Sequence, residues 1–250
     1  VMDSFSKAGL YLSLAPQTVM ALLKKAVGKL GEKKKIGRGS VVLVDIDNTL
    51  TDFPSSFKLL KKKSPKLFKL SNAEYQAALR GEVPPEVGLE AVWHKIAEDN
   101  SITKRDWQEL AREAVQSKGF NHGLATDLKE ARRRGAKIIL ASLTHEHFAR
   151  ELNDLLGFDG FVASARGRTI TPRSSRFGSR HKTKYDAART KYGLHPEFLI
   201  SDRLDHDAGS AARTCNVHVE TGGGQSLSRA IGMHSIEFGE EKPLHRVGLL

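Results

Sequence analysis

Short apolar runs alternate with helix-like stretches along the second half of the chain. Residues 137–141 (KIILA), 160–163 (GFVA) and 198–200 (FLI) are brief and mostly apolar, which is typical of buried parallel strands. Between them, residues 148–156 and 184–192 are helix-like, and each stretch ends at a glycine. This alternation predicts right-handed βαβ units, and therefore an α/β fold with a Rossmann-like parallel sheet and helices on both faces.

Further elements of the same kind extend this pattern in both directions. A β-branched, continuously apolar run (SVVLV) precedes the region described above, and a helix-like stretch ends at Gly135. A polar segment rich in Ser, Gly and Arg predicts a basic loop. These further elements are strands at 40–44, 216–219 and 235–238, helices at 124–134 and 207–214, and the basic loop at 166–180.

The first half of the chain has a different pattern, dominated by helical periodicity. Residues 17–30 place apolar side chains on one helical face and lysines elsewhere, so this basic amphipathic helix could pack on its own domain or lie on a membrane. Residues 53–118 look helical and irregular, with amphipathic helices expected at 89–96 and 107–114. The second of these helices begins near a plausible N-cap, either Thr103 or Asp106.

These patterns divide the chain into three parts. Residues 1–39 form a basic N-terminal extension, residues 40–52 and 119–250 form the α/β core, and residues 53–118 form a helical insertion after the first strand. A chain of 250 residues is long enough for one sizeable core and a smaller appended unit.

The chain carries a net charge of +11, from forty Lys and Arg against twenty-nine Asp and Glu. Such a balance favours anionic partners, which include phosphorylated metabolites, nucleic acid and an acidic membrane surface, or it serves solubility alone. No stretch approaches the ~20 apolar residues of a spanning helix, and the single Cys215 has no internal disulfide partner. We therefore expect a cytoplasmic protein, with association to a membrane surface as a further option.

Polar side chains follow three predicted strands at their carboxyl ends. In open parallel sheets, ligands bind beyond these ends, so side chains from distant parts of the chain can meet there. Two lysines near the start of a predicted helix add positive charge to this edge. The side chains are Asp45, Asp47, Ser142 and Asp202, with Lys182 and Lys184 between the second and the third strand end.

On these residues the chain resembles the phosphoserine-phosphatase-like branch of the haloacid dehalogenase (HAD) superfamily. Residues 41–51 (VVLVDIDNTLT) match the apolar strand and D-x-D-x-T of its first motif, and residues 135–142 lead to the second-motif serine. Residues 181–184 (HKTK) look like the third motif, and residues 198–207 look like the fourth in its D-x4-D form. The resemblance implies a HAD core whose insertion, residues 53–118, is a helical cap of the first kind.

The resemblance also implies an Mg²⁺-dependent phosphomonoester hydrolase. Asp45 would attack phosphorus and form an aspartyl-phosphate, and Asp47 would protonate the leaving oxygen and then activate water. Asp45, Asp47 through its backbone carbonyl, Asp202 and Asp207 would bind the metal. Asp205 is an alternative at the last position, where the spacing favours Asp207.

Four residues would bind the phosphate group by the same resemblance: Thr49, Ser142, Leu143 and Lys182. Ser142 and Lys182 would also act in catalysis, Ser142 by donating a hydrogen bond to a phosphoryl oxygen and Lys182 by neutralising phosphate charge. The distance from the following motif favours Lys182 over Lys184. Ser201 departs from the family pattern, which usually has a glycine before the fourth-motif aspartate.

The motifs indicate the substrate class less directly than they indicate the reaction. A small phosphorylated metabolite comes first, phospholipid head groups second and nucleic-acid phosphate ends third. The alternative function is a HAD-fold binding module, which would dock on nucleic acid or another anionic assembly through its basic surface.

Overall fold

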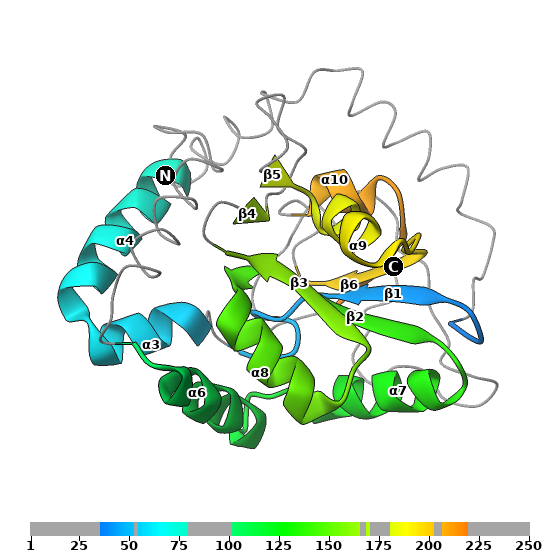
Figure 1. Cartoon of the computed structure of the whole chain (residues 1–250), viewed down its shortest axis with the longest axis horizontal. Coiled ribbons are helices and arrows are strands. Elements are labelled where there is room, and N and C mark those ends of the chain that lie inside the picture. Colours follow the sequence, from blue (N-terminus) through cyan, green and yellow to red (C-terminus); the bar gives the residue numbers. More distant parts are fainter. Residues whose placement is uncertain are drawn as a thin grey trace, which may run out of the picture.

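In the part of the chain that the structure describes, five parallel strands form the central sheet, in the order β3-β2-β1-β6-β7 (Figure 1). This computed structural model describes residues 36–52, 55–79, 102–165, 169–170, 181–202 and 207–219. The helices predicted at 17–30 and 89–96 and the strand predicted at 235–238 lie outside these ranges. The strands are β1 (Val41–Val44), β2 (Lys137–His145), β3 (Gly160–Ser164), β6 (Phe198–Ser201) and β7 (Cys215–His218).

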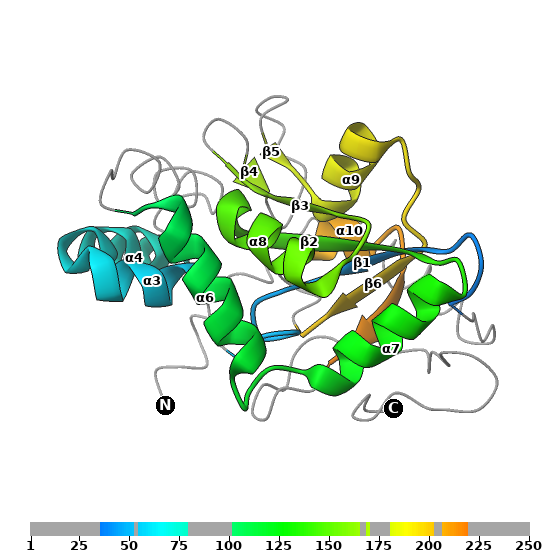
Figure 2. The same ribbon diagram turned by 60° about the horizontal axis from the view of Figure 1, so that its bottom comes forward.

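Helices cover both faces of this sheet, which confirms the predicted α/β class (Figures 1 and 2). On one face, α7 (His122–Arg133) and α8 (Glu146–Leu156) pack against side chains such as Val42 and Val44 of β1. On the other face, α9 (Lys184–Tyr192) and α10 (Ala208–Ala211) pack against side chains such as Leu43. Because successive side chains of a strand point to opposite faces, β1 contributes to both apolar layers.

The register of β1 with its two neighbours brings three strand ends to the same level. Val44 pairs with Leu140 of β2 on one side and with Ile200 of β6 on the other. The backbone N–H of Asp45 then donates to the carbonyl of Ile200 at 2.9 Å. The residues that follow each of these strand positions therefore meet at one edge of the sheet.

Two elements differ in length from their predictions. Strand β2 continues past Ser142 to His145, with a shift of its register against β3 between Ala141 and His145. Helix α10 spans only four residues, although a helix was expected over 207–214. Side chains end it early, because Thr214 donates to the carbonyl of Ser210 and Asn216 donates to that of Ala211.

The insertion between β1 and α7 contains α3 (Ser55–Lys63), α4 (Pro65–Leu79) and α6 (Lys104–Gln116). Helix α6 begins at the predicted N-cap Thr103, whose hydroxyl forms a capping box with Asp106. Helices α3 and α4 lie to one side of the sheet (Figure 2), and both Leu60 of α3 and Trp107 of α6 are buried in the main core. The division of the chain into extension, core and cap stays a prediction.

A second, two-stranded parallel sheet pairs β4 (Thr169–Ile170) with β5 (His181–Lys182). Only residues 169–170 of the predicted basic loop and β5 directly after it are described in this region. Among the described helices, none combines the length and the apolar character that crossing a membrane requires.

Candidate active site

Asp45 stands at the carboxyl end of β1, where the chain makes a tight turn. The carbonyl of Ile46 accepts hydrogen bonds from the backbone N–H groups of Thr49, Leu50 and Thr51. Asn48 has a positive φ of 62°, a conformation that asparagine tolerates better than most residues. The N–H of Ile46 donates to Oδ1 of Asp45 at 2.8 Å, so this turn fixes the orientation of the carboxylate.

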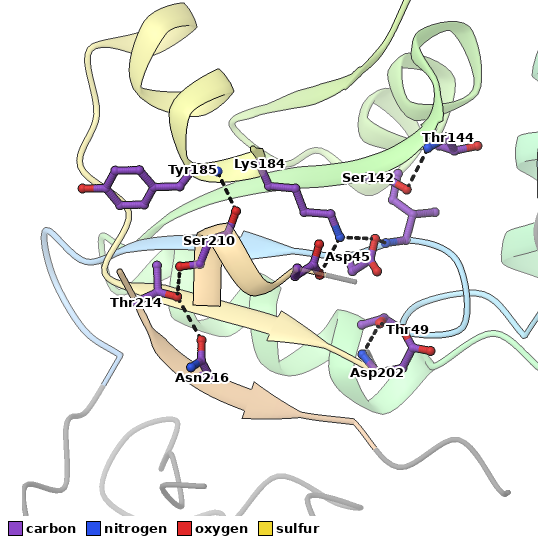
Figure 3. Close-up of polar contacts among 12 residues, drawn as sticks. Asp45, Thr49, Ser142, Thr144, Lys184, Tyr185, Asp202, Ser210, Thr214 and Asn216 are labelled. Atoms are coloured by element: carbon purple, nitrogen blue, oxygen red, sulfur yellow. Dashed lines mark hydrogen bonds and ion pairs between the residues drawn. The ribbon is translucent and has the colours of Figure 1, made fainter. Parts of the chain in front are cut away.

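Lys184 is the cation that lies against Asp45. Its side chain is 1% exposed, and its Nζ lies 2.9 Å from Oδ1 of Asp45 (Figure 3). The same Nζ lies 2.7 Å from Oδ2 of Asp207. Thr183 caps the amino end of α9, which makes Lys184 the first residue of that helix. A buried lysine of this kind requires paired carboxylates, because an isolated charge in the interior is very costly.

The hydroxyl of Ser210 joins α10 to the start of α9 and so holds the Lys184–Asp207 ion pair in place. Oγ of Ser210 accepts from the N–H of Tyr185 at 3.0 Å, next to Lys184 (Figure 3). The N–H of Ser210 donates to the carbonyl of Asp207 at 2.8 Å. Ser210 therefore sets the positions of both partners of the Lys184–Asp207 pair. No motif in the sequence pointed to this residue.

Asp202 reaches the same edge at the end of β6 and is held by Thr49. Oγ1 of Thr49 accepts from the N–H of Asp202 at 2.9 Å and donates to its Oδ1 at 3.3 Å. Both residues are buried. Thr49, predicted to bind phosphate, thus uses its hydroxyl to fix the neighbouring carboxylate.

The electrostatics of the site are those of three carboxylates around one ammonium group. Burial and then the negative charge of Asp45 raise the pKa of Asp202 to about 7. Burial raises the pKa of Asp207 to about 6, although the charge of Lys184 acts in the opposite direction. Burial alone would lower the pKa of Lys184, but the charges of Asp207 and Asp45 outweigh it and raise that pKa. The edge therefore carries more negative charge than its own lysine neutralises.

This donor set fits Mg²⁺. Asp45 and Asp202 offer two carboxylates whose charges disfavour each other, and a divalent cation would relieve that repulsion. In the described ranges, no three His, Cys, Asp or Glu side chains are grouped as a metal site. Mg²⁺ is commonly held by one or two carboxylates together with water and substrate phosphate, so two carboxylates and the backbone carbonyl of Asp47 are enough. Asp207 contacts Lys184 instead.

Lys182, the lysine that the sequence favoured, does not contact this cluster. Its Nζ donates to Oγ1 of Thr190 at 3.0 Å on the exposed side of α9. The preference for Lys182 came from its distance in the sequence to the next motif, and this distance does not indicate which lysine side chain is buried. Thr183, a threonine N-cap, identifies Lys184 as the first residue of α9, but the burial of Lys184 comes from packing.

The remaining predicted residues lie around the same strand ends. Ser142 is buried in the irregular part of β2, and its Oγ accepts from the N–H of Thr144 at 3.2 Å (Figure 3). Leu143 is half-buried and packs against both apolar layers. Asp47 is half-buried in the turn after β1, where it forms a β-bridge with Thr51. Asp205 lies outside the described residues.

Comparison with known proteins rests on structure alone, since no family model and no curated protein matches the chain. A protein of unknown function from Bordetella pertussis Tohama I is 15% identical, with a TM-score of 0.56 over 81% of this chain and 100% of the other. A probable phosphoserine phosphatase from Vibrio cholerae is 14% identical, with a TM-score of 0.56 over 76% of this chain and 58% of the other. The chain thus shares the fold of this probable phosphoserine phosphatase, which is the fold that the resemblance of its motifs predicted.

Proposed function

We propose that this chain is an Mg²⁺-dependent phosphomonoester hydrolase that uses Asp45 as its nucleophile. The observation that carries the proposal is the contact of Asp45 with the buried Lys184 at the strand edge that also holds Asp202. These groups come from three distant parts of the chain, and their residue types suit the handling of a phosphate dianion. A small phosphorylated metabolite is the substrate class that we propose first.

Charge neutralisation is the first requirement of this reaction, because a phosphate dianion repels an anionic nucleophile. The carboxylates of Asp45 and Asp202 and the carbonyl of Asp47 would hold Mg²⁺, which neutralises phosphoryl charge when it is bound. Lys184 holds Oδ1 of Asp45 and adds positive charge beside the reacting group. Ser142 would donate a hydrogen bond to a phosphoryl oxygen, with the backbone of Leu143 beside it.

The chemical steps then use the two acidic residues of the first motif. A carboxylate oxygen of Asp45 forms a bond to phosphorus while the ester P–O bond breaks, and Asp47 gives its proton to the leaving oxygen. In the second step Asp47 takes a proton from water as the water oxygen attacks phosphorus, which releases inorganic phosphate and restores Asp45. Because Ile46 and Lys184 both hold Oδ1 of Asp45, the carboxylate cannot rotate away between the steps.

The test is hydrolysis of a generic aryl phosphate with Mg²⁺ and with a chelator, comparing wild type, Asp45→Asn and Asp154→Asn. Asp154 is an exposed residue of α8 and provides the same chemical change far from the strand edge. We expect Mg²⁺-dependent activity in wild type and in Asp154→Asn, and a loss of about 10³-fold or more in Asp45→Asn. Wild-type protein that is inert with every divalent metal, or an Asp45→Asn variant that stays active, would disprove the proposal.

A further inference from the structure

A dense group of lysines covers helices α3 and α4, which follow the Asp45 turn in the chain. Residues 55–73 contain no Asp or Glu, so nothing within this segment offsets the positive charge. Neither helix has an acidic residue in its first turn. The lysines are Lys58, Lys61, Lys62, Lys63, Lys66 and Lys69.

Two of these lysines have a structural task. Lys63 pairs with Asp106 at 2.6 Å and Lys62 pairs with Glu113 at 3.5 Å, and both pairs join α3 to α6. The other four are exposed, and no ion pair links them to any residue in the described ranges. Their charges therefore face solvent without a partner from this part of the chain. These four are Lys58, Lys61, Lys66 and Lys69.

An exposed leucine lies among these lysines. Leu70 of α4 is 49% exposed, and it follows Lys69 directly and Lys66 by one helical turn. In the described ranges, the other large apolar side chain with comparable exposure is Leu155 of α8. A single exposed leucine is ordinary by itself, but here it extends a basic surface with an apolar side chain that can leave water.

Packing between the helices fixes this arrangement. The rings of Phe57 and Phe68 meet edge to face with centroids 6.3 Å apart, and Leu59 and Leu60 are buried. Apolar side chains therefore hold α3 against α4 and the core, while Lys58, Lys61, Lys66 and Lys69 are exposed. Because Phe57 and Phe68 pack against the core, neither ring offers the exposed stacking platform that single-stranded nucleic acid uses.

We propose that this surface, Lys58, Lys61, Lys66, Lys69 and Leu70, docks on an anionic lipid membrane. Ammonium groups would approach the negative head groups, and Leu70 would enter the boundary between head groups and acyl chains. The contact is electrostatic first, so it weakens as salt screens the charges. This inference concerns binding and does not rest on the proposed hydrolase activity.

The test is co-sedimentation of the full chain with vesicles of phosphatidylcholine alone and of phosphatidylcholine mixed with phosphatidylserine. We expect binding only to the mixed vesicles, with loss at high salt. The triple variant Lys61→Glu, Lys66→Glu, Lys69→Glu should bind about tenfold more weakly or worse, since each lysine near such a surface contributes roughly fivefold. The matched control changes three exposed lysines elsewhere by the same charge: Lys118→Glu, Lys129→Glu and Lys137→Glu.

A second pair of variants separates a membrane from other polyanions. Leu70→Ser should weaken vesicle binding severalfold, whereas Leu155→Ser, which alters the exposed leucine of α8, should leave it unchanged. Equal losses in the two triple variants, absence of wild-type vesicle binding, or indifference to Leu70→Ser would each overturn the proposal. Tighter binding to an RNA or DNA oligonucleotide than to the vesicles would overturn it in favour of nucleic acid. Circular dichroism spectra establish that every variant is folded.

Discussion

At the scale of single residues, the site depends on one buried ammonium group. Lys184 contacts Asp45 and Asp207 with a side chain that is almost fully buried. Removing one partner of a buried ion pair leaves the remaining charges without compensation, which costs about 3–5 kcal/mol. Lys184 therefore supports both the orientation of Asp45, the proposed nucleophile, and the stability of the fold.

We predict that Lys184→Met and Lys182→Met will have opposite outcomes. Lys184→Met should lower kcat/KM by about 10²-fold or more and reduce the free energy of unfolding by about 3 kcal/mol. Lys182→Met should change the free energy of unfolding by less than about 0.5 kcal/mol and leave kcat/KM nearly unchanged, because the partner of its Nζ among the described residues is Thr190, on the exposed side of α9. Aryl phosphate kinetics and urea denaturation measure both quantities. A larger activity loss in Lys182→Met would contradict the assignment of Lys184.

The sequence was sufficient to predict some of these residues and not others. Asp45 and Asp202 could be predicted because each directly follows an apolar run, and strand ends of a parallel sheet converge. The choice between Lys182 and Lys184 depends on which side chain is buried, and burial comes from packing that residue spacing does not encode. Ser210 could not be predicted, because its role lies in contacts between two elements.

At the scale of elements, helices α6 and α8 are joined by a stacked pair of rings. The indole of Trp107 in α6 stacks on the imidazole of His145 with centroids 5.1 Å apart and planes 10° apart. His145 also caps α8, because its Nδ1 accepts from the N–H of His147. This acceptor role requires an unprotonated Nδ1. Burial, and then the charges of His147 and Arg150, lower the pKa of His145 to about 3.

We predict that this histidine makes the fold sensitive to mild acid. The unfolded chain binds a proton at His145 near pH 6.5 and the folded chain only near pH 3, so stability falls as pH decreases through this window. Between pH 7 and pH 5, wild type should lose about 2 kcal/mol more than His145→Asn, which retains a capping side chain but does not titrate. Urea denaturation at each pH measures the difference. His195→Asn, a change at an exposed position, should behave as wild type, and a His145→Asn variant with the same pH dependence would refute the prediction.

Element boundaries were predictable where local signals set them. Helix α9 spans Lys184–Tyr192 as predicted, because Thr183 caps its start and Gly193 ends it in a left-handed conformation. Helix α10 was predicted too long, because Thr214 and Asn216 bond its carbonyls through side chains that a periodicity argument ignores. The extension of β2 to His145 likewise depends on pairing with β3.

At the scale of the whole molecule, the fold buries several carboxylates close together, and their mutual repulsion lowers its stability. Asp45, Asp202 and Asp207 are all buried at one edge of the sheet, where Lys184 pairs with Asp45 and Asp207. Burying like charges together disfavours folding, and such clusters are typical of functional sites. The apolar layers on the two faces of the sheet compensate for this cost.

We predict that the metal-free protein is destabilised by the repulsion between these carboxylates. Burial and the charge of Asp45 raise the pKa of Asp202 from 3.8 to about 7, so the folded chain binds this proton more tightly than the unfolded chain. The stability of the metal-free protein therefore falls as pH rises from about 4 to 7. In Asp202→Asn the amide carries no charge and can keep both contacts with Thr49, so with a chelator at pH 8 this variant should be more stable than wild type by about 2 kcal/mol.

Adding Mg²⁺ should reverse that order, because a ligand that binds only the folded state stabilises it in proportion to the logarithm of its concentration. Thermal unfolding should show that Mg²⁺ raises the Tm of wild type and of Glu109→Gln, which removes an exposed carboxylate paired with Arg105. Asp202→Asn should gain little from the metal. If Asp202→Asn were the less stable protein in chelator, or gained as much from Mg²⁺ as wild type, the carboxylates at this edge would not form the metal site that the mechanism requires.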